Sequence, residues 1–265
     1  MNIIVCIKQV PASSQTQVDP DTGLLLRAGA ESRMNPYDLF AVEMALQLRQ
    51  RYGGRITAIT MGPPQAEAVI RESYALGADD GVLVTDRRFA GADVLATSYT
   101  LYQAIRCLGG YDLVLCGKQT TDGDTAQVGP ELAERLNIPS VANVSSIWLD
   151  EGGRMAVTYE IGEYVINARI TRPCLICIDK DINTPRLPSY VKRKATAGRP
   201  IRLLTLEDLP DKEQGHYGLD GSPTHVERVF QPENEPIHEV WRGSPKDMAE
   251  RLLSIVTSYG LRDTG

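Results

Sequence analysis

The stretch GKQTTDGDTAQVGPELAERL, residues 117–136, contains the residues most suited to binding an anion. The apolar run Leu113–Cys116 leads into a glycine-containing turn with Asp122 and Asp124, and a helical pattern follows. A helix N-terminus attracts anions because its first backbone N–H groups have no partner within the helix. We therefore expect an anion such as phosphate at this turn. The two aspartates then have other tasks, one bracing the turn or capping the helix and the other accepting from a sugar hydroxyl.

Three further loops follow predicted strands, namely Lys8–Pro11, Met61–Pro63 and Asp86–Thr97. The carboxyl ends of parallel strands meet at one edge of a sheet, and ligands bind just beyond that edge. Glycine in such loops lets backbone N–H groups approach a phosphate closely. Together with residues 117–128, these loops predict a nucleotide pocket.

Other kinds of site lack the residues they need. No G-x-G-x-x-G follows the first predicted strand, and no Walker A lysine motif occurs. The histidines at 216, 225 and 238 lie far in sequence from the loops, which disfavours a histidine-based triad. Cys174 and Cys177 form a C-x-x-C, but a strand would turn them to opposite faces, and no second pair completes a site. We predict neither a metal site nor a catalytic side chain.

The composition is that of an ordinary globular protein, with 265 residues, 42% of them hydrophobic and 23% charged. The formal net charge of -6 argues against a nucleic-acid binder. No run of 18 apolar residues is present, so we expect no membrane span. The first residues, MNIIVCIKQVP, lack a basic region and a cleavage site and indicate a first strand, so we expect a cytoplasmic protein.

The first 140 residues alternate between apolar runs and helical patterns. Strands are predicted at 3–7, 56–61, 81–85 and 113–116, with helices after Asn35, over 66–77 and 93–108, and up to about residue 136. This alternation predicts a Rossmann-like α/β fold, a parallel sheet with helices on both faces. Further runs at 144–149, 155–161, 164–170 and 174–178 predict strands that extend the same sheet with an antiparallel edge.

The pattern changes after residue 182. Prolines and basic residues fill the link up to Arg199, residues 207–245 are rich in Pro, Gly, Asp and Glu, and a last helix is predicted at about 244–259. An irregular loop this long is unusual inside a compact domain. We therefore predict two parts: a nucleotide-binding domain of residues 1–182 and an extended arm of residues 183–265 that orders on a partner.

Six segments together resemble the β subunit of electron-transfer flavoproteins, in this order: CIKQVP, MNPYDLFAVEMAL, TMGPP, ALGADDGVLVTD, DLVLCGKQTTDGDTAQVGPELAERL and TPRLPSYVKRK. The resemblance covers the whole chain. It implies a heterodimer with an α subunit, which carries FAD on a mobile domain and is wrapped by the C-terminal arm and helix. The common members of this family hold AMP in the β subunit as a structural ligand.

The electron-bifurcating members instead hold a second FAD that accepts hydride from NADH. One electron then goes to the α-subunit FAD and on to an acyl-CoA or hydroxy-acid dehydrogenase, and the other goes to ferredoxin or flavodoxin. Residues 86–98, DRRFAGADVLATS, favour this group because they resemble its usual loop, DRAFGGADTLATS. Ala90 and Val94 are conservative departures from that loop. Arg88 is a larger one, which suggests contact with a partner or with the NADH entrance.

The resemblance also implies roles for individual residues. Cys6 and Asn35 would contact the adenosine half, and Met61 and Gly62 would flank the adenine. The remaining cofactor-binding residues would be Phe89, Gly91, Ala92, Asp93, Thr97, Asp122, Gly123, Asp124, Thr125, Ala126, Gln127 and Val128. Residues Pro188, Tyr190 and Val191 would dock the dehydrogenase.

Two alternatives compete with the bifurcating subunit. The first is an AMP-type β subunit, a binding and docking module whose nucleotide does no redox work. The second is an ATP-using enzyme or a stress-type nucleotide binder on a similar fold. That class requires a phosphate loop of the kind SGGxDS or GxxGxGxxS, and the sequence contains neither.

Overall fold

The computed structural model describes residues 1–12, 32–227 and 240–258. The chain divides into two units, Met1–Glu227 and Arg228–Gly265. The described part of the second unit contains one helix, α6 (Pro245–Ser258), which matches the helix predicted at 244–259. Residues 228–239 of the expected arm, including His238, lie outside the described residues, as does the end of the chain from 259.

The first unit is built on a nine-stranded sheet with the order β11-β5-β4-β1-β6-β10-β7-β8-β9. Its strands are β1 (Asn2–Cys6), β4 (Arg55–Met61), β5 (Asp80–Val84), β6 (Leu113–Gly117), β7 (Ser140–Leu149), β8 (Met155–Ile161), β9 (Tyr164–Ile170), β10 (Cys174–Ile178) and β11 (Arg202–Leu204). A separate antiparallel pair joins β2 (Gln9–Pro11) to β3 (Ser32–Met34). Neighbouring strands are parallel from β11 to β7, whereas β7, β8 and β9 are antiparallel. The predicted α/β class with an antiparallel edge is therefore confirmed.

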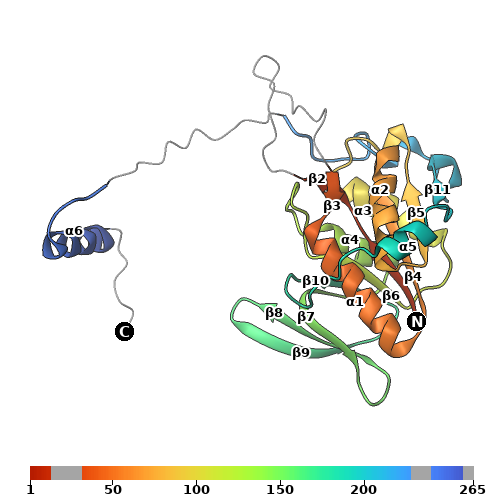
Figure 1. Ribbon diagram of the computed structural model, residues 1–265. Helices are drawn as coiled ribbons and strands as arrows, with labels where there is room; N and C mark the ends of the chain where they lie inside the picture. The colour runs from red at the N-terminus through yellow and green to blue at the C-terminus, as the bar shows by residue number, and fades with distance from the viewer. Residues whose placement is uncertain (13–31, 228–239, 259–265) are drawn as a thin grey trace. The chain divides into compact units, whose positions relative to one another are not determined.

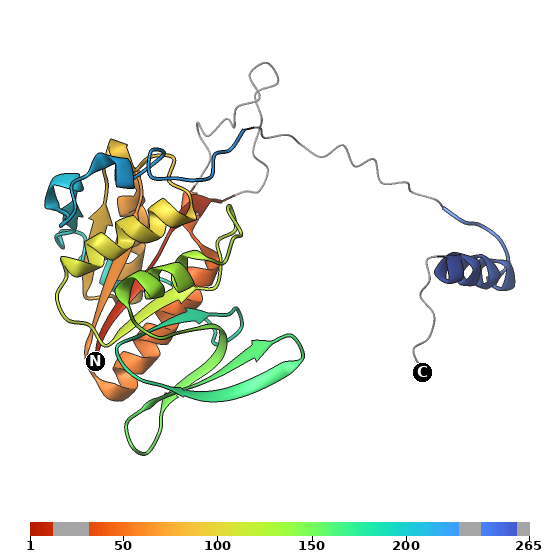
Figure 2. The same ribbon diagram turned by 180° about the vertical axis from the view of Figure 1, so that it is seen from behind.

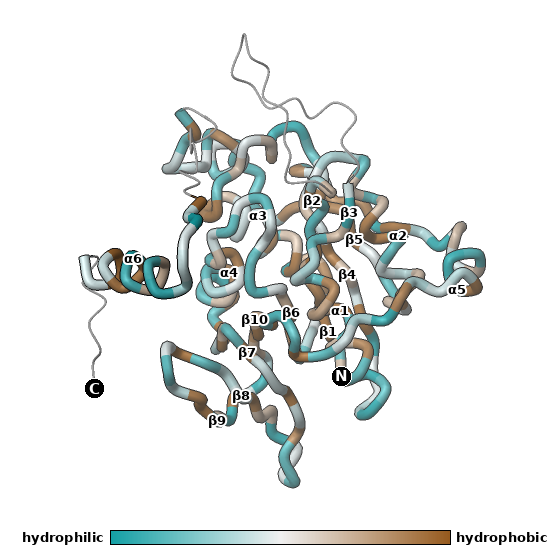
Figure 3. Tube along the Cα trace, turned by 60° about the vertical axis from the view of Figure 1, so that its left-hand side comes forward, coloured by the Kyte–Doolittle hydropathy of each residue, from teal (hydrophilic) through white to brown (hydrophobic). Residues whose placement is uncertain are grey.

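Helices cover both faces of this sheet. Figure 1 shows α1 (Pro36–Tyr52) and α2 (Glu67–Leu76) in front of the sheet, and Figure 2 shows α3 (Val94–Arg106) and α4 (Val128–Leu136) in front of the opposite face. The central strands carry the most apolar segments of the chain (Figure 3). Because both of their faces are buried, these strands read as continuous apolar runs.

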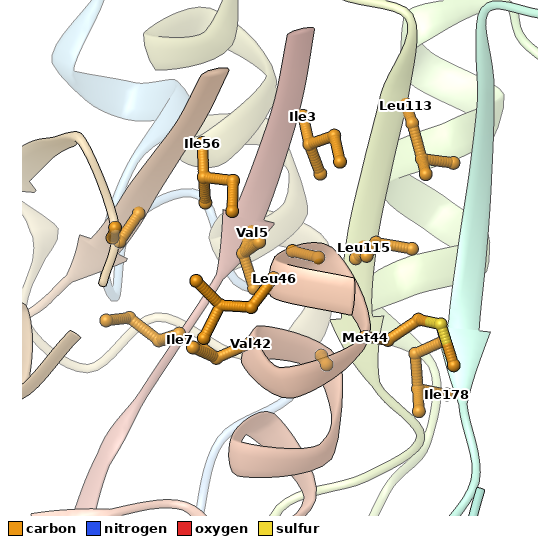
Figure 4. Close-up of a cluster of buried hydrophobic side chains, with 14 of the residues drawn as sticks. Ile3, Val5, Ile7, Val42, Met44, Leu46, Ile56, Leu113, Leu115 and Ile178 are labelled. Atoms are coloured by element: carbon orange, nitrogen blue, oxygen red, sulfur yellow. The ribbon is translucent and has the colours of Figure 1, made fainter. Parts of the chain in front are cut away.

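Two hydrophobic cores result, one on each face of the sheet. The first contains Val42 and Leu46 of α1 together with Val5 of β1 and Ile56 of β4 (Figure 4). The second core packs α3 and α4 against the other face of the same strands. Cys174 belongs to the first core and Cys177 to the second, so the C-x-x-C does point to opposite faces, as a strand requires.

Strand β10 does not lie at the antiparallel edge next to β9. It pairs in parallel with β6 on one side and with β7 on the other. Its five residues are all buried, which explains why CLICI contains no polar position. The antiparallel strands β8 and β9 therefore project beyond β7, while β10 completes the parallel core.

The compact unit continues well beyond residue 182. The segment 183–227 contains helix α5 (Tyr190–Ala195), strand β11 paired in parallel with β5, and the buried side chains of Leu206, Leu209 and Tyr217. The predicted boundary at 182/183 thus differs from the division at Glu227. Leu204, Leu206, Leu209 and Tyr217 of this segment belong to the second core, and this attaches the segment to its own domain.

Candidate functional site

A cavity of about 1040 Å³ lies at the carboxyl ends of β1, β4, β5 and β6. This is the edge at which open α/β sheets bind their ligands. A smaller cavity of about 590 Å³ lies beside the start of β6 and of β10 and includes Arg154, Arg169 and Arg172. Arg154 and Arg169 share one carboxylate partner, Asp150, and Arg172 donates to the carbonyl oxygen of Gly153 at 3.2 Å.

Most of the predicted cofactor residues line the large cavity. They are Cys6, Met61, Gly62, Phe89, Gly91, Ala92, Asp93, Thr97, Gly123, Thr125, Ala126, Gln127 and Val128. Three predicted residues, Asn35, Asp122 and Asp124, are not part of the lining. The structure gives these three other contacts.

The loop before α4 presents free backbone donors. Asp124 and Ala126 have φ angles of 52° and 55°, which is the left-handed region that side chains other than glycine seldom adopt. Within the described part of the chain, no hydrogen bond occupies the N–H groups of Thr125, Ala126 and Gln127. Three exposed donors just before a helix N-terminus form a concavity suited to an anion.

Asn35 holds this loop from beneath. It occupies the position before α1, but its side chain does not cap that helix. Its amide donates to the carbonyl oxygen of Gln119 at 2.9 Å and accepts from the N–H of Thr121 at 3.3 Å. Asn35 is fully buried, so it fixes the base of the loop and has no exposed surface toward a ligand.

Asp38 lies beside Asn35 and forms part of the cavity lining. Its carboxylate accepts from the backbone N–H of Lys8 at 2.7 Å and from the Asn35 amide at 2.9 Å. Burial raises the pKa of Asp38 to about 7, although both hydrogen bonds and the charge of Lys8 oppose this rise. Asp38 therefore connects the end of β1 to the start of α1.

The two aspartates of the turn have separate partners. Asp122 forms an ion pair with Lys8, whose Nζ lies 2.8 Å from Oδ1 and 2.7 Å from Oδ2. Partial burial would raise the pKa of Asp122, but the hydrogen bond and charge of Lys8 outweigh it and the pKa is lowered. Asp124 accepts a hydrogen bond from the Gln119 amide and so braces the turn. Neither aspartate caps α4, whose N-cap position is Gln127.

Asp93 fastens the C-terminal segment over the cavity. Its Oδ1 caps α3 by accepting from the N–H of Ala96 at 3.0 Å. Its Oδ2 accepts from the N–H of Thr224 at 3.1 Å and from the Thr224 hydroxyl at 2.7 Å. Burial would raise the pKa of Asp93, but these hydrogen bonds outweigh it and lower the pKa. Thr224 and Val226 consequently line the cavity.

Arg88 faces away from the cavity, whose lining does not include it. Its guanidinium pairs with Asp86 at 2.6 Å and with Glu207 at 3.0 Å. The hydrogen bonds from Arg88 hold the pKa of the Asp86 carboxyl well below its usual range. Arg88, which replaces the alanine of the usual FAD-type loop, thus joins this loop to the segment that follows β11.

Cys6, Cys116 and Cys177 stand side by side in register on β1, β6 and β10. Cys6 and Cys116 line the cavity. The pKa of Cys116 is raised by its hydrogen bond with Cys6 and by burial, and burial raises the pKa of Cys177 to about 12. Cys116 and Cys177 are therefore neutral packing groups at ordinary pH. No cluster of His, Cys, Asp or Glu suited to a metal occurs among the residues that the structure describes.

The lining also includes residues that no sequence signal had assigned. Lys8 and Arg87 come from loops that the strand pattern had identified, whereas Asp38, Thr224 and Val226 had no local signal. Their contribution depends on contacts with distant parts of the chain.

The predicted docking residues lie apart from the cavity, around the start of α5. Pro188, Tyr190 and Val191 are all exposed, together with Leu187. They adjoin the basic run Lys192–Lys194. No described helix is long and apolar enough to cross a membrane.

Known proteins are similar in sequence to this chain over most of its length. The family model described as electron transfer flavoprotein domain matches residues 22–209. The electron transfer flavoprotein subunit β of Thermoanaerobacterium thermosaccharolyticum is 41% identical over 259 residues, covering 97% of this chain and 98% of the relative. Protein FixA of Azorhizobium caulinodans is 44% identical over 238 residues, covering 88% and 85%. The acryloyl-CoA reductase electron transfer subunit γ of Anaerotignum propionicum is 40% identical over 260 residues, covering 96% and 97%. The chain therefore belongs to the electron transfer flavoprotein family, among its β subunits and FixA proteins.

Proposed function

We propose that this β subunit works in a heterodimer with an α subunit and binds FAD in the cavity of about 1040 Å³. When bound there, FAD would supply hydride acceptance from NADH and the splitting of the electron pair. One electron would pass through the α-subunit FAD to a dehydrogenase, and the other to ferredoxin or flavodoxin. Cofactors carry such chemistry while the protein supplies binding, orientation and electrostatics.

The observation that carries the proposal is the extent of the cavity. Small-molecule sites usually span about 300–1,000 Å³, and this one reaches the upper end of that range. It runs from Cys6 and Met61 to the loop containing Phe89–Asp93. A dinucleotide would use this whole length, whereas a mononucleotide would leave the part beside the loop empty.

Individual residues fit the two ends of such a ligand. The free N–H groups of residues 125–127 would hold the phosphates, and Met61 and Gly62 would flank the adenine. The Thr97 hydroxyl has no hydrogen-bond partner among the described residues and would accept or donate at the flavin half. The carboxylate of Asp93 is already engaged by Ala96 and Thr224, so its task would be to hold the segment around Thr224 at the edge of the cavity.

The competing function is a β subunit that holds AMP as a structural ligand. We expect the purified heterodimer to contain two FAD per αβ pair and to be reduced by NADH, measured by flavin extraction, nucleotide analysis and absorbance spectra. One FAD and one AMP per pair, with no NADH reduction, would instead establish the AMP-type function. Apo-protein reconstituted with FAD in excess AMP is the control for loss during purification.

We also propose that the residues around the start of α5 dock the dehydrogenase, for acyl-CoA or a hydroxy acid. Tyr190 and Val191 are 77% and 75% exposed, although both side chains are large and apolar. Apolar side chains this exposed, bordered by a basic run, are typical of a contact surface.

Tyr190→Ala is expected to slow electron delivery to the dehydrogenase by about tenfold or more, the effect of losing an interface anchor of about 2 kcal/mol. The measurement is the rate of dehydrogenase reduction in the reconstituted complex. NADH reduction of the heterodimer should stay unchanged, and so should its thermal unfolding. Tyr164→Ala, which removes an equally exposed tyrosine from β9, is the matched control. Equal rates for Tyr190→Ala and wild type would disprove docking at this surface.

A further inference from the structure

We propose that the Lys8 ammonium group binds a phosphate of the nucleotide in the cavity. Before the nucleotide binds, the Asp122 carboxylate takes the place of that phosphate as the partner of Lys8. This inference rests on the proposed function, because it requires a nucleotide in the cavity. It adds a side-chain cation to a phosphate site that otherwise consists of backbone N–H groups.

The geometry around Lys8 is that of an anion site. Its Nζ lies at 2.8 Å and 2.7 Å from the two oxygens of one carboxylate, so it already binds a pair of anionic oxygens. The backbone of Lys8 is fixed, since its N–H donates to the buried carboxylate of Asp38 at 2.7 Å. Lys8 lines the cavity, whereas Asp122 does not. The ammonium group is thus held at the rim by a partner outside the lining.

The position of the partner connects Lys8 to the phosphate loop. Asp122 belongs to the same turn as Thr125, Ala126 and Gln127, whose N–H groups are free of partners within the described chain. A phosphate held by these donors would therefore lie near the ammonium group. The second lysine of the lining, Lys118, pairs at 3.0 Å with Asp179, which lies after β10 and outside the lining.

Exchange of the carboxylate for a phosphate would cost little. Lys8 and Asp122 are 43% and 33% exposed, and ion pairs at such exposure contribute little to stability. A phosphate offers more negative charge and more acceptor oxygens than a carboxylate. The turn does not depend on the ion pair, because Asn35 binds Gln119 and Thr121 and the Gln119 amide binds Asp124. Asp122 can therefore release Lys8 while the turn keeps its shape.

A purely structural clasp would have a different signature. If Lys8 only tied the turn to β1, removing either partner would loosen the whole pocket. Ligands with and without phosphate would then lose affinity equally, and changes at Asp122 would match those at Lys8. If Lys8 binds phosphate, replacing Lys8 weakens the binding of phosphorylated compounds only, and replacing Asp122 does not weaken it.

The test is calorimetric titration of the nucleotide-free, full-length chain with adenosine, AMP and ADP. Lys8→Gln should weaken the binding of AMP and ADP by about tenfold or more, as expected for the loss of a charged hydrogen bond. Its affinity for adenosine should change less than twofold. Lys8→Arg should restore most of the phosphate-dependent affinity. Asp122→Asn should bind AMP as tightly as wild type or more tightly. Matching thermal unfolding of all variants checks that each is folded.

Two outcomes would overturn the inference. Equal losses for adenosine and AMP in Lys8→Gln, repeated in Asp122→Asn, would assign the pair to a structural clasp. Wild-type affinity for AMP in Lys8→Gln would remove Lys8 from the site while leaving the proposed function intact. If the wild-type chain binds none of the three ligands, the proposed function itself is wrong, and this result is distinct from the other two.

Discussion

Replacing Tyr217 with alanine is expected to lower the free energy of unfolding by about 3–5 kcal/mol, the usual cost of truncating a large buried aromatic side chain. Tyr217 is 1% exposed, and its ring centroid lies 5.4 Å from that of Phe89 and 5.4 Å from that of Tyr99. Its hydroxyl donates to the carbonyl oxygen of Asp211 at 2.6 Å. Tyr217 is among the largest fully buried side chains of the described residues, and it belongs to the second core.

The loss of stability should extend to the lining of the cavity. Phe89, which packs on Tyr217, is part of that lining, and so is Thr224, which follows Tyr217 by only a few residues. Next to Tyr217, Gly218 adopts a φ of 57° and approaches the carbonyl of Arg88 so closely that no side chain would fit. The N–H of Leu219 then donates to the carbonyl of Ala90 at 3.0 Å. Without the Tyr217 ring, we expect faster hydrogen exchange over residues 218–226 and weaker nucleotide binding.

Urea unfolding and hydrogen exchange measure this effect. Tyr217→Phe keeps the ring and should lose only about 1 kcal/mol, the value of one hydrogen bond. Tyr190→Ala, at an exposed site, should change the unfolding free energy by less than about 0.5 kcal/mol. An unfolding midpoint of Tyr217→Ala equal to that of wild type would mean that the segment does not contribute to the stability of the domain.

The parallel part of the fold could be predicted because its signals are local. The run Ile3–Ile7 and the helical spacing after Asn35 each report burial within a few residues of sequence. Strand β1 (Asn2–Cys6) and helix α1 lie within one residue of those predictions at their starts. The lateral order of strands is a long-range property, so the sequence of β10 could not reveal that it inserts between β6 and β7.

The segment 183–227 was predicted as an arm because its buried side chains follow no period. Leu206, Leu209 and Tyr217 are separated by polar and glycine residues that resemble an extended chain. Each side chain fills a separate gap in the second core, so burial here follows tertiary contacts and leaves no repeating pattern.

The candidate site was predictable to the extent that it follows the strand-end rule. That rule placed the loops, and the loops supplied most of the lining. The hydrogen bonds of Asn35 could not be predicted, because the sequence around Asn35 and Pro36 carries only local signals. The actual partners of Asn35 are Gln119 and Thr121, which are more than 80 residues away along the chain. The same distance conceals the pairing of Lys8 with Asp122.

The second large effect is a loss of stability with rising pH, caused by Asp38. This side chain is 5% exposed, and burial raises its pKa to about 7, compared with about 3.9 in an unfolded chain. Between these two values the folded state binds more protons than the unfolded state, so the free energy of unfolding falls as pH rises. A difference of about three pKa units corresponds to a stabilisation of at most ~4 kcal/mol. This stabilisation is fully present below about pH 4 and is lost above about pH 7.

The measurement is the free energy of unfolding of wild type and of Asp38→Asn from pH 2 to 8. Asparagine cannot ionise, and the cost of placing its amide beside the Lys8 and Asn35 donors does not vary with pH. The difference between wild type and variant should therefore fall with rising pH. Asp86→Asn is the control of opposite sign, because hydrogen bonds from Arg88 lower the pKa of Asp86, and its contribution is lost as pH falls below about 4. A constant difference for Asp38→Asn would mean that the Lys8 and Asn35 hydrogen bonds outweigh burial and keep the carboxylate charged. In that case the end of β1 would be joined to α1 by a permanent anion, and the cavity would carry one more negative charge against its phosphate at neutral pH.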